Sequence, residues 1–214
     1  MKKLIIAALI ATAFTGAAHA HGHKHEGEKA DQGVVYGSAF MGTNDSTGLT
    51  VGYATKSEIV KDSMAFVEVN QFSVSDKVTG NGMNHGVNLL NSKGVSAGLM
   101  KKDGDFGYGV ALSYSNTEIE NLNYKRDGLG IKAHVDYHIG QACVYGDVAV
   151  KPDFLSNTTV DNLYAEVDLK AGVKYNLNKK VAVFSEVKSS VAYDSNDKRT
   201  DLYSTVGAGV SLAF

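Results

Sequence analysis

The 214 residues carry 21 basic and 23 acidic side chains, a formal net charge of −2, which excludes the basic surface typical of nucleic-acid-binding proteins. The single cysteine, Cys143, excludes an internal disulfide, and the length suits one domain. A mean hydropathy of −0.14 is typical of soluble proteins, but membrane barrels also average to neutral because their apolar residues occupy alternate positions.

Residues 1–20 predict a secretory signal peptide. Two lysines precede an apolar run over residues 4–14, and Ala-His-Ala at 18–20 fits a cleavage site. The run is shorter than the about 20 apolar residues of a membrane-spanning helix, and no later segment approaches that length. We therefore expect an exported protein that enters a membrane, if at all, through β-strands.

Residues 21–33 are charged and lack apolar periodicity, which predicts a flexible periplasmic leader. Cleavage after Ala20 would give a chain that begins His21-Gly22-His23. Its free amine, two deprotonated amides and the His23 imidazole would form the planar nitrogen field that Cu(II) or Ni(II) prefers, with His25 as a further donor nearby. The alternative is a charged spacer, because His-rich composition alone is weak support for a metal site.

From residue 34 onward the sequence predicts strands. Apolar and polar residues alternate with a period of two, most clearly over Leu163–Leu177. Short connections at 102–105, 140–141 and 178–180 alternate with long polar ones at 116–127, 152–162 and 194–201, as in barrels with short periplasmic turns and long outer loops. The predicted strands are Val34–Met41, Gly48–Ala54, Met64–Val74, Gly86–Met100, Phe106–Ser115, Gly128–Ile139, Ala142–Lys151, Leu163–Leu177, Val181–Tyr193 and Leu202–Phe214.

These strands predict an all-β fold, a closed antiparallel transmembrane β-barrel over residues 34–214 with eight to ten strands, ten being favoured. A turn or bulge at 91–94, or an eight-stranded barrel with a long plug, is the alternative for the first half. Aromatic residues should lie on the apolar face, in girdles at the two ends. We expect Phe106, Tyr108, Tyr137, Tyr175 and Phe214 at the periplasmic ends, and Tyr114 and Tyr193 at the outer ends.

The last strand resembles the terminal signal that the outer-membrane assembly machinery recognises in Gram-negative barrels. It ends on the aromatic Phe214, with Leu212 two residues before it, whereas Ala208 stands at a position that is usually polar in that signal. The resemblance implies insertion into the cell outer membrane of a Gram-negative bacterium, with the assembly machinery and outer-membrane lipid as partners. We expect a monomer.

Residues 144–190 resemble the YfaZ-type family of small outer-membrane proteins. The similarity lies in a strand that ends before Pro-Asp-Phe-Leu, a long strand that ends Gly-Val-Lys-Tyr, a short turn, and a strand Val-Ala-Val-Phe. It covers about the last third of the chain and extends weakly to residues 98–114. The resemblance implies location and fold, and it brings no reaction and no functional residues.

The polar face of the later strands holds the other candidate site. Pairing across the turn at 140–141 puts His134 opposite Asp147, Asp136 opposite Tyr145, and His138 opposite Cys143. Across the turn at 178–180, Glu186 would lie diagonal to Lys170 and Lys174, and Asp168 diagonal to Lys188. We favour an ion-pair network that fills a narrow lumen over a catalytic or permeation site. The predicted network is His134, Asp136, Asp147, Asp168, Lys170, Lys174, Glu186 and Lys188.

The sequence thus predicts an integral outer-membrane barrel with a structural, interaction or narrow-pore role, without a catalytic reaction and without a cofactor apart from the metal at the leader. One alternative is an outer-membrane hydrolase that uses lumen His, Asp and Glu side chains. Another is a soluble periplasmic barrel with its faces reversed, which would bind an apolar ligand, because alternation alone does not say which face looks outward.

Overall fold

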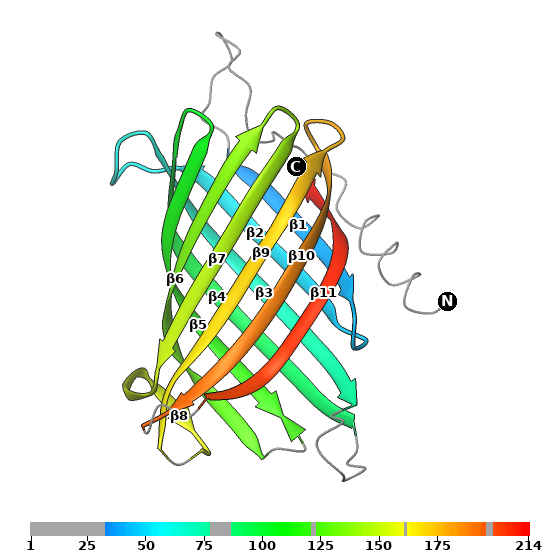
Figure 1. Ribbon diagram of the computed structural model, residues 1–214. Helices are drawn as coiled ribbons and strands as arrows, with labels where there is room; N and C mark the ends of the chain where they lie inside the picture. Colours follow the sequence, from blue (N-terminus) through cyan, green and yellow to red (C-terminus); the bar gives the residue numbers. More distant parts are fainter. Residues whose placement is uncertain (1–32, 78–86, 121–122, 161, 196–198) are drawn as a thin grey trace.

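Ten long strands close into one antiparallel barrel in the computed structural model, which describes residues 33–77, 87–120, 123–160, 162–195 and 199–214 (Figure 1). Each strand pairs with its neighbours along the chain, and β1 pairs with β11 to close the barrel. An eleventh, three-residue strand, β8 (Ser156–Thr158), follows the short 3-10 helix η2 (Asp153–Leu155) and pairs with β6. The barrel strands are β1 Val34–Gly42, β2 Thr47–Lys56, β3 Ser63–Lys77, β4 Val87–Asp103, β5 Phe106–Ile119, β6 Tyr124–Ile139, β7 Ala142–Pro152, β9 Leu163–Asn176, β10 Val181–Asp194 and β11 Arg199–Ala213.

The ten predicted strands are confirmed, and the alternative with a turn at 91–94 is wrong. Strand β4 runs through these residues with ladder partners on both sides, and Lys93 lies opposite Gln71 and Asn116. The polar residues that suggested a turn instead lie on the outward face, where Asn91 and Lys93 are exposed. A strand tolerates them because its backbone hydrogen bonds are made to both neighbours.

The predicted long loop at 116–127 is also wrong, because most of it is strand. Strand β5 continues to Ile119, and β6 already begins at Tyr124. The reason is burial, since Ile119 is 1% exposed and Arg126 is 0% exposed, both facing inward. The segment is polar in composition, so the sequence did not show that its inward-facing residues are buried inside the barrel. Within the described residues, no helix has the length and apolar character needed to cross a bilayer.

Both ends of the barrel sequence lie at one end of the barrel, together with the short connections (Figure 1). Phe214 closes the seam there, because its N–H donates to the Val35 carbonyl at 2.7 Å and its carbonyl accepts from the Val35 N–H at 3.1 Å. We name this the turn end, since it carries the β4–β5, β6–β7 and β9–β10 turns. The opposite end, which carries the β5–β6, β7–β9 and β10–β11 connections, is the loop end.

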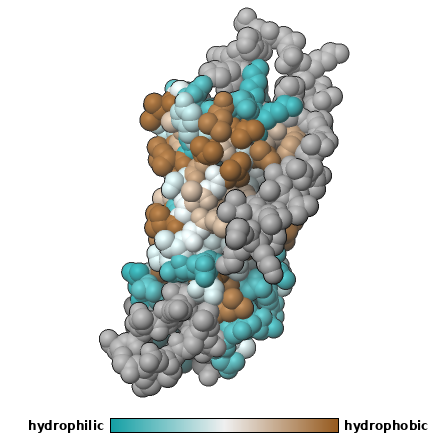
Figure 2. All heavy atoms as spheres, turned by 90° about the vertical axis from the view of Figure 1, so that its right-hand side faces the viewer, coloured by the Kyte–Doolittle hydropathy of each residue, from teal (hydrophilic) through white to brown (hydrophobic). Residues whose placement is uncertain are grey.

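The apolar parity of the strands faces outward. Leu112, Ile131 and Val110 are 57–66% exposed, whereas Lys132, His134, Asp136 and Asp147 of the same wall face inward. Figure 2 shows one side of this surface, with apolar side chains on the barrel wall and hydrophilic residues toward its ends. A soluble barrel with reversed faces would need the opposite arrangement, so that alternative does not describe this fold. Other members of the outward apolar belt are Val67, Val69, Val135, Val148, Leu169, Val173, Val187, Val206 and Val210.

The predicted aromatic positions are largely confirmed. At the turn end, the outward-facing Phe106, Tyr108, Tyr137 and Tyr175 are 44–51% exposed, and toward the loop end Tyr114 is 44% exposed. Tyr193 is only half-buried, beside a register shift where β10 meets β9.

Beyond the apolar belt, outward residues become polar toward the loop end. Gln71, Lys93, Asn116 and Asp127 follow one another in register across β3, β4, β5 and β6. We call these four residues the outer collar. The hydrogen-bonded wall therefore continues past the height at which its outer face is apolar.

Glycines on the inner face give room to large neighbours. A Cβ at Gly107 would lie 2.3 Å from Asp136 Oδ2, and a Cβ at Gly172 would lie 2.7 Å from the Tyr145 ring. Either substitution would force the neighbouring side chain to move. Small residues thus alternate with large ones around the lumen, as the narrow interior of a small barrel requires.

Candidate functional site

The register places the predicted polar residues on the inner face of β6 and β7. His134 lies opposite Asp147, Asp136 opposite Tyr145, and His138 opposite Cys143, so the predicted pairing is confirmed. Because side chains alternate between the two faces of a strand, the residues at these positions of β6 and β7 all point into the lumen. The lumen is therefore the site at which charged groups gather.

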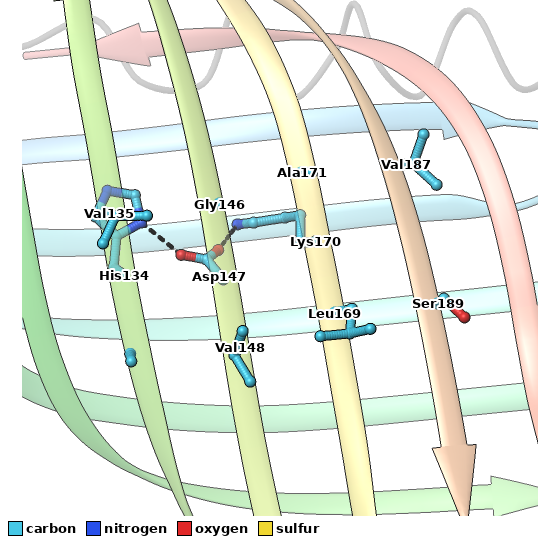
Figure 3. A pocket seen from close by; sticks show the side chains of 11 residues that line it. His134, Val135, Gly146, Asp147, Val148, Leu169, Lys170, Ala171, Val187 and Ser189 are labelled. Atoms are coloured by element: carbon cyan, nitrogen blue, oxygen red, sulfur yellow. Dashed lines mark hydrogen bonds and ion pairs between the residues drawn. The ribbon is translucent and has the colours of Figure 1, made fainter. Parts of the chain in front are cut away.

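Asp147 is the centre of the largest group. Its Oδ1 lies 2.5 Å from His134 Nδ1, and its Oδ2 forms an ion pair with Lys170 of β9 (Figure 3). The Asp147 side chain is 8% exposed, whereas those of His134 and Lys170 are 26% and 31% exposed. A buried carboxylate is stabilised by partners on both sides, because burial without them would cost several kcal/mol, by order of magnitude.

The same histidine continues the chain of contacts toward the turn end. His134 Nε2 lies 3.1 Å from Asp136 Oδ2, and Asp136 Oδ1 lies 2.9 Å from His138 Nε2. Lys170, Asp147, His134, Asp136 and His138 thus form one line of alternating basic and acidic groups along the inside of the barrel. Each carboxylate in this line has a basic neighbour on either side.

A second contact crosses the interior. Lys132 of β6 forms an ion pair with Glu68 of β3 at 2.7 Å, and Glu68 also accepts a hydrogen bond from Tyr36 at 3.3 Å. Strands β3 and β6 are not neighbours in the sheet, so this ion pair bridges the lumen rather than running along its wall.

A third group joins the charged and apolar parts of the lumen. Glu186 of β10 forms an ion pair with Lys188 at 3.0 Å and accepts a hydrogen bond from the Tyr145 hydroxyl at 2.7 Å. The ammonium of Lys188 lies 4.3 Å from the ring centroid of Phe40 and 4.8 Å from that of Phe72. These distances are within the range of cation–π attraction.

A fourth group is buried near the loop end. Lys151 of β7 forms ion pairs with Glu166 and, at 2.7 Å, with Asp168, and Tyr124 donates a 2.7 Å hydrogen bond to Glu166. The side chains of Lys151 and Glu166 are only 5% and 1% exposed. The Arg126 guanidinium is also fully buried, and its Nη2 lies 3.4 Å from the Pro152 carbonyl oxygen.

The loop half of the lumen is filled by an apolar cluster. Its aromatic members pack together, with the Phe72 ring centroid 6.2 Å from that of Phe40 and 5.0 Å from that of Tyr203. The buried members are Phe40, Phe72, Val74, Leu90, Ile119, Tyr124, Leu163 and Ala192, and Val160, Phe184, Leu202 and Tyr203 pack against them.

Some predicted contacts are replaced by others. Lys170 pairs with Asp147 of β7 instead of the diagonal Glu186, and Asp168 pairs with Lys151 instead of Lys188. Lys174 lies opposite Cys143 in the register of β7 and β9. The error arose because the reasoning stayed within each hairpin, whereas lysine side chains reach the strand on the other side. His21, His23 and His25 lie outside the described residues.

Sequence reasoning missed Glu68, Lys132, Lys151, Glu166 and Arg126. The Lys151–Glu166 contact had a signal, because these two residues are direct cross-strand partners once β7 and β9 are paired. The long connection between these strands gave no reason to fix their register. The Lys132–Glu68 contact had no local signal, since it joins opposite sides of the lumen.

The outer side of the same wall carries an apolar hollow of about 450 Å³ around Gly146 (Figure 3). Val135, Val148, Leu169 and Val187 are among its lining residues. These four belong to the outward apolar belt, and His134, Asp147 and Lys170 are also among the residues that line the hollow.

Two arrangements bear on chemistry. Both ring nitrogens of His134 contact carboxylates, Nδ1 with Asp147 and Nε2 with Asp136. A histidine that activates a nucleophile needs one ring nitrogen for that nucleophile. At the turn end, by contrast, Asp136, His138 and Cys143 bring three donor atoms of the kind that bind metals within 4.8 Å of one another.

No protein-family model and no curated protein matches the chain. Among solved structures, it is similar to OmpT, an outer membrane protein of Vibrio cholerae, with 13% identity over 79% of this chain and 56% of that one, at a TM-score of 0.41. It is similar to the outer membrane channel DcaP of Acinetobacter baumannii, with 11% identity over 83% and 54% of the two chains, at a TM-score of 0.43. It is also similar to outer membrane phospholipase A from Escherichia coli, with 13% identity over 84% and 92%, at a TM-score of 0.35. The chain spans less than two-thirds of the length of the first two proteins.

Proposed function

We propose that the protein is an integral outer-membrane barrel whose lumen is closed, and that it has a structural or interaction role rather than transport or catalysis. The observation that carries this proposal is the combination of an apolar outer wall with a lumen bridged by ion pairs and filled by an apolar cluster. The resemblance to YfaZ-type proteins and the terminal assembly signal belong to the same proposal.

The outer wall supports membrane insertion. A bilayer requires that every backbone polar group be paired inside the protein, and a closed barrel meets this requirement. Phe214 completes the pairing at the seam between β1 and β11. The apolar belt, with aromatic residues near the turn end and a polar outer collar toward the loop end, is the arrangement expected of a barrel in lipid.

The interior supports a closed lumen. The Lys132–Glu68 ion pair spans the barrel from β6 to β3, and Lys188 of β10 reaches the rings of Phe40 and Phe72. Beyond them, the apolar cluster buries Ile119 and Leu90 to 1% and 2% exposure. A hydrated ion would have to displace apolar side chains to pass, which costs free energy because the ion would lose water without gaining partners.

The geometry of the histidines favours a non-catalytic role over the hydrolase alternative. His134 has no ring nitrogen left for a nucleophile, and His138 Nε2 contacts Asp136. The acidic groups are likewise joined to lysine or histidine in the described part of the lumen. This pairing of carboxylates with basic groups supports a role in which the lumen charges stabilise the barrel.

The membrane part of the proposal is tested by charges on the outward face at two depths. Leu169→Arg puts a cation within the apolar belt and should lower the free energy of unfolding in lipid by about 2 to 4 kcal/mol. Gln71→Arg is the control, since it changes the same face at the outer collar, where the cost falls to about 0 to 1 kcal/mol. Refolding into liposomes, followed by heat-modifiable migration on a gel, gives the measurement. Equal tolerance of both arginines would contradict insertion.

The closed lumen is tested separately by conductance. Purified protein in planar bilayers should give no steady channel, and proteoliposomes should not swell in arabinose. The triple variant Lys132→Ala, Glu68→Ala, Phe72→Ala removes the bridge and part of the apolar cluster, and should conduct. A steady current through the unaltered protein would overturn the closed lumen and leave the membrane location standing.

Assembly is tested by deletion of Phe214. This variant loses two hydrogen bonds to Val35 at the seam and the aromatic end of the signal. We expect less protein in outer-membrane fractions and more periplasmic degradation. A Phe214→Tyr variant keeps both the backbone bonds and an aromatic end, and should insert normally. Normal insertion after deletion would remove the terminal signal from the proposal.

A further inference from the structure

Three metal-binding types of side chain meet at the turn end of the lumen. Asp136 and His138 lie two residues apart on the inner face of β6, and Cys143 stands directly opposite His138 on β7. The β6–β7 turn is only residues 140–141, so it holds the two strands in a fixed register here. The geometry of the hairpin therefore holds the three side chains close to one another.

Their donor atoms are close enough for one ion. A carboxylate oxygen, an imidazole nitrogen and the thiol sulfur all lie within 4.8 Å of one another. Two donors on a tetrahedral zinc ion, each about 2.0 to 2.3 Å from the metal, are separated by roughly 3.5 Å. Asp136 Oδ1 and His138 Nε2 are already 2.9 Å apart, so side-chain rotations that bring the Cys143 sulfur closer to both would complete the site without any movement of the strands.

These donors have few competing partners. Cys143 is 2% exposed, and its sulfur lies 3.7 Å from the Val144 carbonyl oxygen, which is a long hydrogen bond. Asp136 Oδ1 lies 2.9 Å from His138 Nε2 but is not aligned with it as a hydrogen bond. The backbone also makes room, because any side chain at Gly107 would collide with the Asp136 carboxylate.

We propose that Asp136, His138 and Cys143 form a binding site for one divalent metal ion of the zinc class, open at its fourth position. A thiolate with nitrogen and oxygen donors suits zinc and excludes the hard ions magnesium and calcium. The thiolate and the carboxylate together neutralise the two charges of the ion. His134, which contacts Asp136 Oδ2 at 3.1 Å, orients that carboxylate from outside the site.

Two lysines border the site, and their positive charges determine which ligands a metal ion needs there. Lys174 stands opposite Cys143, and Lys102 stands opposite Gly107, which is itself opposite Asp136. Both carry a positive charge beside the metal-binding side chains. The same charge opposes a cation unless both anionic ligands bind it, so loss of either ligand should abolish binding rather than weaken it slightly.

The experiment separates this site from the copper site predicted at the leader. The full chain carries His21→Ala, His23→Ala and His25→Ala, is refolded in detergent under mild reductant, and is titrated with Co(II). We expect one Co(II) per chain with a sulfur-to-cobalt charge-transfer band, displaced by Zn(II). Cys143→Ser should remove the band, Asp136→Asn should abolish binding, and His138→Gln should lower the affinity at least tenfold. Heat-modifiable migration verifies the fold of every variant.

A relocated thiol provides the matched control. The double variant Cys143→Ser, Ser113→Cys keeps one lumen thiol but places it six residues along β5 from Gly107, roughly 20 Å from the site by the rise of a strand. This variant should show no band. The proposal is overturned if Co(II) binds equally well without Cys143, if the relocated thiol restores the band, or if folded protein with reduced Cys143 binds no Co(II).

Discussion

The two halves of the lumen are filled by different chemistry. In the loop half, the apolar cluster surrounds the Lys151–Glu166 ion pair, whose side chains are 5% and 1% exposed. In the turn half, by contrast, His134 and Lys170 are 26% and 31% exposed. Lys151 and Glu166 therefore depend on their protein partners, whereas His134 and Lys170 also have water.

This difference predicts that similar ion pairs contribute different amounts to the free energy of unfolding. Removing one member of a buried pair leaves the other charge without compensation, which costs about 3 to 5 kcal/mol. A solvated pair contributes about 0 to 1 kcal/mol, because water replaces the lost partner. The loop half should therefore dominate the stability of the barrel, although it holds fewer of the charged residues.

Removal of one lysine from each half gives the largest contrast. Lys151→Met leaves the buried Glu166 without its cationic partner and should lower the free energy of unfolding by about 3 to 5 kcal/mol. Lys132→Met breaks the Lys132–Glu68 pair, whose side chains are 20% and 12% exposed, and should cost less than Lys151→Met because water can partly replace the lost lysine. Urea unfolding of the protein in lipid measures both. Equal losses would mean that the two halves are equally dry.

Truncation in the apolar cluster should have the next largest effect. Ile119→Ala leaves a cavity at a residue that is 1% exposed and should cost about 2 to 5 kcal/mol. Leu112→Ala on the same strand faces outward and is 66% exposed, so lipid or detergent fills the space and the loss should be much smaller. The same unfolding assay compares them. A larger loss at Leu112 would place the packed core on the wrong face of β5.

The two halves also differed in how far the sequence predicted them. The turn half was predicted because His134, Asp136 and Asp147 lie on adjacent strands joined by a two-residue turn, which fixes their register. Period-two alternation likewise predicted the ten strands and which residues share a face, since it depends only on neighbouring residues. These inferences needed no knowledge of the tertiary structure.

The loop half was not predicted, because its residues lie near strand ends in segments of polar composition. Ile119 and Tyr124 lie within a stretch interpreted as a loop, and they become core only when they meet Phe72 and Leu90 from other strands. In the turn half, the Lys132–Glu68 pair was also missed, because it joins residues 64 positions apart. Contacts across a lumen depend on the closure of the whole barrel, and a local pattern does not contain that information.

Two tyrosine–carboxylate hydrogen bonds of equal length also compare the two halves of the lumen. Their removal should lower the free energy of unfolding by less than the substitutions above. Tyr124 donates to Glu166 in the loop half and Tyr145 donates to Glu186 in the turn half, each at 2.7 Å. Tyr124→Phe should cost about 1.5 to 3 kcal/mol, the range for a hydrogen bond to a charged group. Tyr145→Phe should cost less, because Tyr145 is only half-buried, whereas Tyr124 is 5% exposed. The reverse order would contradict the distinction between a dry and a wet half.

The smallest effect is expected at an ion pair outside both halves. Arg199 and Asp201 form a 2.7 Å contact at the loop end of β11, with side chains 59% and 67% exposed. Because water solvates both partners, Arg199→Ala should leave the unfolding midpoint within experimental error. Salt extends the test, since mobile ions screen exposed charges but enter a dry interior poorly. Raising the ionic strength should therefore remove any residual effect of Arg199→Ala while leaving the loss in Lys151→Met unchanged, and a salt-dependent loss in Lys151→Met would show that the loop half is wet.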